Sequence, residues 1–494
     1  MPKKPGFFRR LFTRRKHERK FDAAAVSRLL SDWTTSSQAI DEDIKSGLAT
    51  VRARSRDLCT NNDYGKKFMT MLAVNVVGPN GIRLQAKVED AQEVAVEEAN
   101  AKIEAAWKQW SRKEFCTVNR RLTFCDVQRL FIQSVARDGE ILISMVAKED
   151  NPFQFALQII EPDNLDIGYS DANKNIVMGV EKNGYKEPVA YHLFSQNPGA
   201  LSYQAPGQKR QRVPATDIIH AFITERADQT RGIPWTATAL KRLHMLGHYE
   251  WSELVSARVG AAKMGFFYKD GDMGYPYDDK DSSGNLIDEV EPGTFKELPA
   301  GYRFEKFDPD HPNAGFDDFI KAILRGAAAG LNVSYASLSN NLADVNYSSI
   351  RHGTIEERDI WMMLQSWMIE HFCQPVFERW LLQALMTKEL ALPAGLYNEF
   401  KSVSWQPRRW GWVDPLKDMQ ANTTAVQMGF KSRSEIIMEQ GGDLDDTFAR
   451  LAAEKQKADE LGLNINSTRE KDSKDGADDD QNRDTVSRIQ LYTR

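Results

Sequence analysis

Apolar residues recur at helical spacing in the first third of the chain. Over about residues 36 to 77, Ile44, Leu48, Val51 and Leu58 form such a series. Further helices are predicted at about 90–111 and 124–137. The segment 76–84, which contains Pro79 and Gly81, predicts a strand, a turn and a second strand.

The apolar period shifts towards two from about residue 140 to 225. Short runs rich in β-branched and aromatic residues alternate there with clusters of Gly, Pro, Asn and Asp. This pattern predicts a mainly antiparallel sheet region, and with the flanking helices an α+β fold. Neither a GxGxxG sequence nor a P-loop stands between a strand and a helix, so no nucleotide site or other cofactor is expected.

Helical patterns dominate again after residue 232. A long helix is predicted over 233–265, with Pro234 in its first turn, and another from Phe316 to about Gly330. The stretch between them is rich in Gly, Pro and Asp, and we expect short strands in it, such as YRFEKF. A polar stretch without clear period (334–353) precedes a long helix over 355–386, which Pro375 should kink. A Trp-rich strand (403–415) and helices at about 415–428, 432–440 and 443–462 complete the pattern.

Charge is unevenly distributed along the 494 residues, whose net charge is −5. The first 20 residues hold nine Lys or Arg against Glu18, and an acidic stretch near the other end includes Asp478 to Asp480. Both ends are expected to be disordered arms. Four cysteines without a CxxC pair are expected to be reduced thiols, and no apolar run reaches the length needed to span a membrane.

One pair of residues has the spacing of a metal site. His244 and His248 lie four residues apart on one predicted helix, but Met245 occupies the position where a metalloprotease has Glu, and no third ligand is evident. Packed histidines are favoured. Ser348 and Ser349 lack the frame of a nucleophile elbow, so the chain is not expected to be an enzyme. Two alternatives remain open: a metal-dependent hydrolase built on the two histidines, and a membrane-surface or nucleic-acid-binding protein led by the basic arm.

Several strings, in this order along the chain, resemble the lambda-type family of phage portal proteins. They are EPDNLD (161–166), NGYKEPVAYHLF (183–194), VPATDIIHAF (213–222), RADQTRGIPW (226–235), DVNYSSIRHG (344–353), FCQPVFERWLLQA (372–384), WVDPLKDMQA (412–421) and KSRSEIIMEQGGDLDDTFARLAAEK (431–455). The resemblance covers about residues 35 to 463. "ERAD" departs from the family pattern, in which a Pro is expected before the Gln-Thr-Arg-Gly stretch.

The resemblance implies a portal architecture assembled as a ring of about twelve copies. Its parts would be a basic N-terminal arm (1–35), an α+β wing (36–232), a stem helix (233–265), a clip (266–312), a second stem helix (313–335), a tunnel loop (336–350), a long kinked helix with a wing strand (351–415), a helical crown (416–463) and an acidic tail (464–494).

The function implied is a passive channel for double-stranded DNA at one capsid vertex, during packaging and ejection. The resemblance implies as partners the terminase large subunit, a head-completion or adaptor protein, and the major capsid and scaffold proteins, with no membrane. The virion, and the host cytoplasm during assembly, would be its locations. An acidic subunit suits a low-friction bore with few phosphate contacts. Candidate channel residues are Ser337, Ser339, Asn340, Asn341 and Asp344 in the tunnel loop, with Lys321, Arg325 and Arg351 beside it.

Overall fold

A computed structural model describes residues 28, 31–34, 37–88, 95–199, 210–261, 265–269, 302–306, 315–343, 347–411, 415–440, 442 and 444–462. The chain forms two compact units, Met1–Arg408 and Arg409–Arg494. Most of the predicted basic arm and clip, the whole acidic tail, and Asp344 lie outside the described residues.

The first unit begins with α1 (Ile40–Asn61) and α2 (Asp63–Leu72). The break between them follows from Asn62, whose side chain accepts hydrogen bonds from the backbone N–H groups of Tyr64 and Gly65 and so caps α2. A π-helical turn, η4 (Ala73–Val77), continues α2. The first of the two strands expected in 76–84 is therefore wrong, since Val76 and Val77 are buried in this turn. The second is β1 (Arg83–Ala86), which pairs with β11 (Val403–Gln406).

The predicted antiparallel region is confirmed as two sheets. The three-stranded sheet has the order β3-β2-β8, with β2 (Ile141–Ala147), β3 (Phe155–Ile160) and β8 (Ile218–Ala221). The four-stranded sheet has the order β4-β5-β6-β7, with β4 (Ile176–Val177), β5 (Val180–Lys182), β6 (Pro188–Phe194) and β7 (Arg210–Pro214). All their pairings are antiparallel, and with the helices they make the fold a mixed helix and sheet structure.

An aromatic core lies between the three-stranded sheet and the helices. It is built on α3 (Val96–Trp110), α5 (Phe124–Asp138) and α10 (Gln374–Met386), while α4 (Lys113–Cys116) links α3 to α5. The ring of Trp107 lies 5.1 Å from that of Trp380 and 6.0 Å from that of Trp405. The Trp-rich strand therefore packs within its own chain at Trp405.

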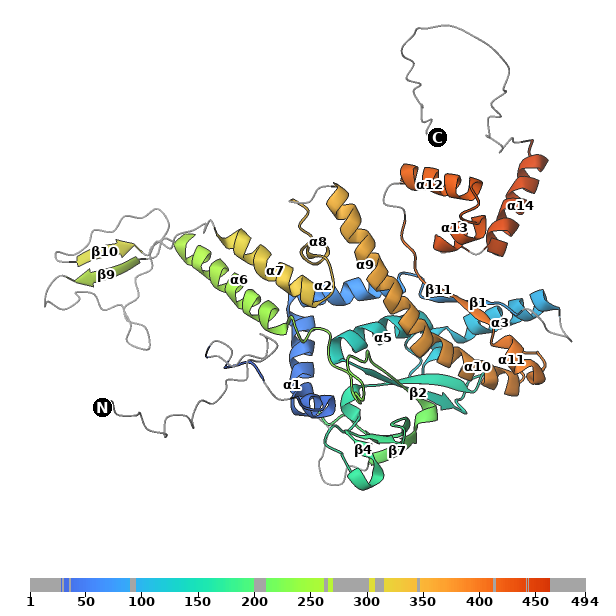
Figure 1. Cartoon of the computed structure of the whole chain (residues 1–494), viewed down its shortest axis with the longest axis horizontal. Helices are drawn as coiled ribbons and strands as arrows, with labels where there is room; N and C mark the ends of the chain where they lie inside the picture. Colours follow the sequence, from blue (N-terminus) through green and yellow to red (C-terminus); the bar gives the residue numbers. More distant parts are fainter. Residues whose placement is uncertain are drawn as a thin grey trace, which may run out of the picture. The chain divides into compact units, whose positions relative to one another are not determined.

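The two predicted stem helices are α6 (Leu240–Ala261) and α7 (Phe316–Gly330), which pack against each other (Figure 1). The start predicted for α6 is wrong by about seven residues. Trp235 instead donates its backbone N–H to the carbonyl of Ala136, 2.9 Å away, and residues 235–239 form turns. The insertion between these helices includes an antiparallel pair, β9 (Gly265–Lys269) and β10 (Tyr302–Lys306).

The long helix consists of α9 (Tyr347–Met368), a π-helical turn η8 (Ile369–Cys373) and α10. Pro375 lies two residues after the end of the π turn. It has no N–H to donate to the carbonyl four residues earlier, so the irregular turn falls where the sequence predicts a disturbance. The short helix α11 (Tyr397–Phe400) leads to β11. The second unit contains α12 (Pro415–Gln427), α13 (Arg433–Glu439) and α14 (Leu444–Glu460), as predicted.

Candidate functional site

The polar stretch before α9 is more ordered than its sequence pattern predicts. It contains a short helix, α8 (Tyr335–Ser339), whose N-cap is Ser334. The hydroxyl of Ser337 donates a hydrogen bond of 2.8 Å to Oε2 of Glu357 on α9. The expectation of a patternless loop is therefore wrong for residues 335–339, which are tied to the long helix. It is also wrong for residues 347–350, because α9 begins at Tyr347, eight residues before the predicted start at 355.

The C-terminal end of α8 is also held. Asn340 has a φ of 56°, which ends the helix, and its side-chain oxygen accepts from Nζ of Lys67 on α2 at 2.9 Å. Ser339 donates its hydroxyl to the carbonyl of Tyr335, while Nδ2 of Asn341 lies 3.4 Å from the hydroxyl of Tyr335. Four of the five predicted tunnel-loop residues thus use their polar groups within the chain, and whether they face DNA stays a prediction.

The three predicted basic contacts differ in their surroundings. Nζ of Lys321 lies 2.7 Å from the carboxylate of Asp317, one turn earlier in α7, and its side chain is only 16% exposed. Arg325 is exposed, and its guanidinium lies 5.5 Å from the ring centre of Tyr335. Arg351 lies half-buried on α9. Arg325 is therefore the most accessible cation of the three.

A buried charge cluster that the sequence patterns did not reveal lies in the first unit. Its members are Glu140, Arg231, Arg52 and His220, and the side chain of each is at most 4% exposed. Nε of Arg231 donates to both carboxylate oxygens of Glu140 at 2.9 and 3.0 Å, and Nη2 of Arg52 donates to Oε1 at 2.7 Å. Burial alone would raise the pKa of Glu140. The charges of Arg231 and Arg52 and the hydrogen bond from His220 nevertheless hold it well below its ordinary value.

Arg231 connects several segments through its remaining donors. Nη1 donates to the carbonyls of Leu165 and Met178, and Nη2 to that of Pro162. These segments flank the strands of both sheets, while Arg52 comes from α1. The cluster therefore fixes α1 and the two sheets to the segment that leads into α6. Its signal in the sequence is Glu140 directly before the apolar run of β2, and Arg231 before Gly-Ile-Pro-Trp.

Two glycines cross beside this cluster. Gly139 ends α5 with a φ of 90°, and a Cβ on Gly232 would lie 2.0 Å from the carbonyl oxygen of Gly139. Only glycine fits at Gly232, because the opposing atoms are backbone. This close approach lets the backbone N–H of Gly232 reach Oε2 of Glu140 at 3.0 Å.

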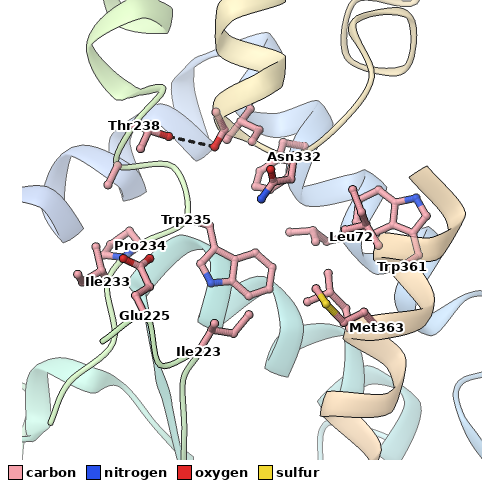
Figure 2. A pocket seen from close by; sticks show the side chains of 16 residues that line it. Leu72, Ile223, Glu225, Ile233, Pro234, Trp235, Thr238, Asn332, Trp361 and Met363 are labelled. Atoms are coloured by element: carbon pink, nitrogen blue, oxygen red, sulfur yellow. Dashed lines mark hydrogen bonds between the residues drawn. The ribbon is translucent and has the colours of Figure 1, made fainter. Parts of the chain in front are cut away.

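A mostly apolar cavity of about 390 Å³ lies where α2, α9, the end of α7 and the turns before α6 meet (Figure 2). Trp235, Trp361, Met363 and Leu72 contribute to its walls, together with Glu225. Thr238 donates its hydroxyl to the carbonyl of Gly330 at 3.0 Å and so joins the turns to α7.

The histidine pair predicted from the sequence lies on α6, and three of the four cysteines are buried. The rings of His244 and His248 lie 4.6 Å apart on α6, but no group of three metal-binding side chains occurs in the described part of the chain. Cys59, Cys116 and Cys373 are buried thiols, and burial raises the pKa of Cys59 to about 11. Among the helices that are described, none is long and apolar enough to cross a bilayer.

Comparison with known proteins identifies the class to which this chain belongs. The family model described as "Phage portal protein, lambda family" matches residues 26–365. The chain therefore belongs to the lambda family of phage portal proteins. This family is structural rather than catalytic, its members are components of the phage virion, and the predicted DNA-packaging role fits it.

Relatives in sequence agree with this assignment. The "Probable portal protein" of Halomonas phage phiHAP-1 is 34% identical over 454 residues, which cover 90% of this chain and 88% of the relative. "Portal protein B" of Escherichia phage lambda is 22% identical and covers 88% of each chain. Among solved structures, the "Neck of native GTA particle computed with C12 symmetry" has a TM-score of 0.42 and 14% identity, and covers 80% of this chain and 99% of that one.

Proposed function

We propose that about twelve copies of this chain form a closed ring at one capsid vertex and that double-stranded DNA passes through it during packaging and ejection. Membership of the portal family is the observation that carries the proposal. The terminase large subunit, a head-completion or adaptor protein, and the capsid and scaffold proteins would be its partners. Assembly would take place in the host cytoplasm.

A closed ring requires two different faces on each subunit, because one side of a copy meets the opposite side of the next. The stem helices offer suitable surfaces. Met245, Trp251 and Leu254 on α6 are more than 60% exposed, and Phe319 on α7 is 47% exposed. Apolar side chains at such exposure are the kind that interfaces between subunits bury.

The parts predicted from the resemblance keep their proposed roles. The segment 36–232 would be the wing, α6 and α7 the stem, 266–312 the clip, and 416–463 the crown. The tunnel loop (336–350) would touch passing DNA. Because α8 is bonded to Glu357 and Lys67, this contact would fall on the loop residues after Asn340.

Negative-stain microscopy and mass measurement of the purified chain test the ring. Particles with a central hole and a mass near twelve subunits are expected. A monomer at every protein and salt concentration would contradict the proposal. A shortened chain that lacks 341–344 but keeps α8 should still form rings while failing to fill heads with DNA. Normal filling by that variant would count against the tunnel loop.

A further inference from the structure

The apolar cavity is large enough to accept side chains from another segment. A cavity of roughly 150 Å³ lined by aliphatic and aromatic groups already holds one benzene ring. At about 390 Å³, this one has room for two rings. Its walls come from elements far apart in the sequence, including Phe68 on α2, Trp235 before α6 and Met363 on α9.

The segment that precedes α1 and the first turn of α1 are bonded to the stretch 226–230, which lies between two wall residues of the cavity, Glu225 and Ile233. Nη2 of Arg226 donates to the carbonyl of Gln38 at 3.1 Å, and the backbone N–H of Thr230 donates to Oδ1 of Asp41 at 2.9 Å. Arg226 is next to Glu225, which lines the cavity. Gln38, to which the N-terminal arm leads, therefore lies close to this cavity.

The arm carries the chemistry that the cavity would accept. Its apolar residues form two pairs four positions apart, Phe7–Phe8 and Leu11–Phe12. They are surrounded by nine Lys or Arg against Glu18, a formal charge of +8 (9 − 1), so the rest of the chain carries −13 (−5 − 8).

Three exposed carboxylates lie at or near the cavity. Glu225 lines it, and Glu356 and Asp359 stand one turn before Ile360 and Met363 on α9.

The length of the arm favours its own cavity over that of another copy. Twenty-six positions separate Phe12 from Gln38, and a flexible coil of that length would span about 28 Å. A tether of this kind gives an effective concentration of the order of millimolar. We propose that the basic arm seats two of its apolar side chains, one from Phe7–Phe8 and one from Leu11–Phe12, in the cavity of the same chain. The seated arm would join α2, the start of α6, the end of α7 and α9 into one junction, a role that the proposed channel does not require.

Limited chymotrypsin digestion of the full chain tests the seating, since this protease cleaves after the arm's own Phe and Leu residues. Met363→Lys places a charge at the cavity wall, where Met363 is 62% exposed and its replacement leaves the core intact. Met362→Lys is the matched control, because Met362 is exposed on the same helix but does not line the cavity.

Cleavage after residues 7–12 should be at least fivefold faster in M363K than in the unaltered chain, and within twofold in M362K. Equal rates in all three would overturn the proposal. A rate that falls as protein concentration rises would show that the arm seats in another copy, which overturns seating in the same chain.

A second measurement uses direct binding. In a full chain whose four apolar arm residues are replaced by Ala, the cavity is left free. A labelled peptide of residues 2–20 should bind this chain, and at least tenfold more weakly when M363K is added. A peptide with the same charges but Ala at the four apolar positions should also bind at least tenfold more weakly. Equal binding of both peptides would mean that charge alone attracts the arm, and would sink the proposal.

Discussion

Arg231→Met is the most direct perturbation of the buried charge cluster. It leaves Glu140 fully buried with one of its two arginines, and it leaves the carbonyls of Pro162, Leu165 and Met178 without their guanidinium donor. Removing one partner of a buried ion pair destabilises a protein by about 3–5 kcal/mol. Arg52 and His220 still contact Glu140, so the loss of the ion pair to Arg231 should destabilise the fold by an amount near the lower end of this range. The lost donors to three carbonyls add to it.

Urea unfolding followed by tryptophan fluorescence measures this loss, because Trp107, Trp110 and Trp380 are buried in the first unit. With an m-value of about 3 kcal/mol/M, the midpoint should fall by about 1 M or more.

Arg212→Met is the matched control. Its guanidinium also contacts a glutamate through two nitrogens, at 2.8 and 2.9 Å, but Arg212 is exposed, so its midpoint should stay near that of the unaltered chain. Equal shifts of the unfolding midpoint in the two variants would refute the argument that burial makes the ion pairs of Glu140 important for stability.

Three further predictions follow from the same geometry. Gly232→Ala should cost about 3 kcal/mol, measured by the same unfolding assay, because its Cβ meets the backbone of Gly139. Gly247→Ala, inside α6 and without such a clash, should instead stabilise by about 1 kcal/mol. Trp251→Asp should shift rings towards monomers in mass measurements, whereas Tyr185→Asp, at an even more exposed aromatic outside α6 and α7, should not.

Acid should weaken the fold partly through Glu140. Its pKa is lowered in the folded chain, so the stability that this lowering contributes is fully present above the ordinary value of 4.5 and is lost as the pH falls below it. Between pH 7 and 3 the unfolding midpoint of the unaltered chain should therefore fall more steeply than that of Glu140→Gln. Parallel curves would contradict the assignment.

Local signals explain which elements could be predicted from the sequence. The helix α7 has the predicted bounds. The helix α5 begins where predicted, because Thr123 and Asp126 form a capping box, and it ends one residue later than predicted, where Gly139 supplies the left-handed C-cap. The start of α6 could not be placed, since the Pro234 signal is overruled by the bond from Trp235 to Ala136, which is nearly a hundred positions away. The sequence predicts a strand at Val76 and Val77 because both are apolar and β-branched. They are buried in η4 by tertiary packing, and they do not pair with a strand.

The site was less predictable than the fold, because partners distant in the sequence determine it. A run of Ser and Asn before Tyr347 is typical of a loop, and nothing local indicates that Glu357 and Lys67 bind it. The Glu140 cluster joins residues 80 to 91 positions apart, a separation that periodicity does not register. Membership of the family could be predicted, since it rests on strings spread from residue 161 to residue 455.

The two cations of α7 allow a sharper test of DNA contact. A phosphate contact needs an accessible cation whose charge is not already neutralised. Arg325 is exposed and has no carboxylate partner among the residues that the structure describes, whereas Lys321 is largely buried against Asp317. We therefore expect Arg325→Gln to change the yield of DNA-filled heads, and its dependence on salt, more than Lys321→Gln does. Each variant must first form rings, which separates a lost DNA contact from failed assembly. If Lys321→Gln had the larger effect on filling by intact rings, exposure would not be what selects the DNA-contacting cation.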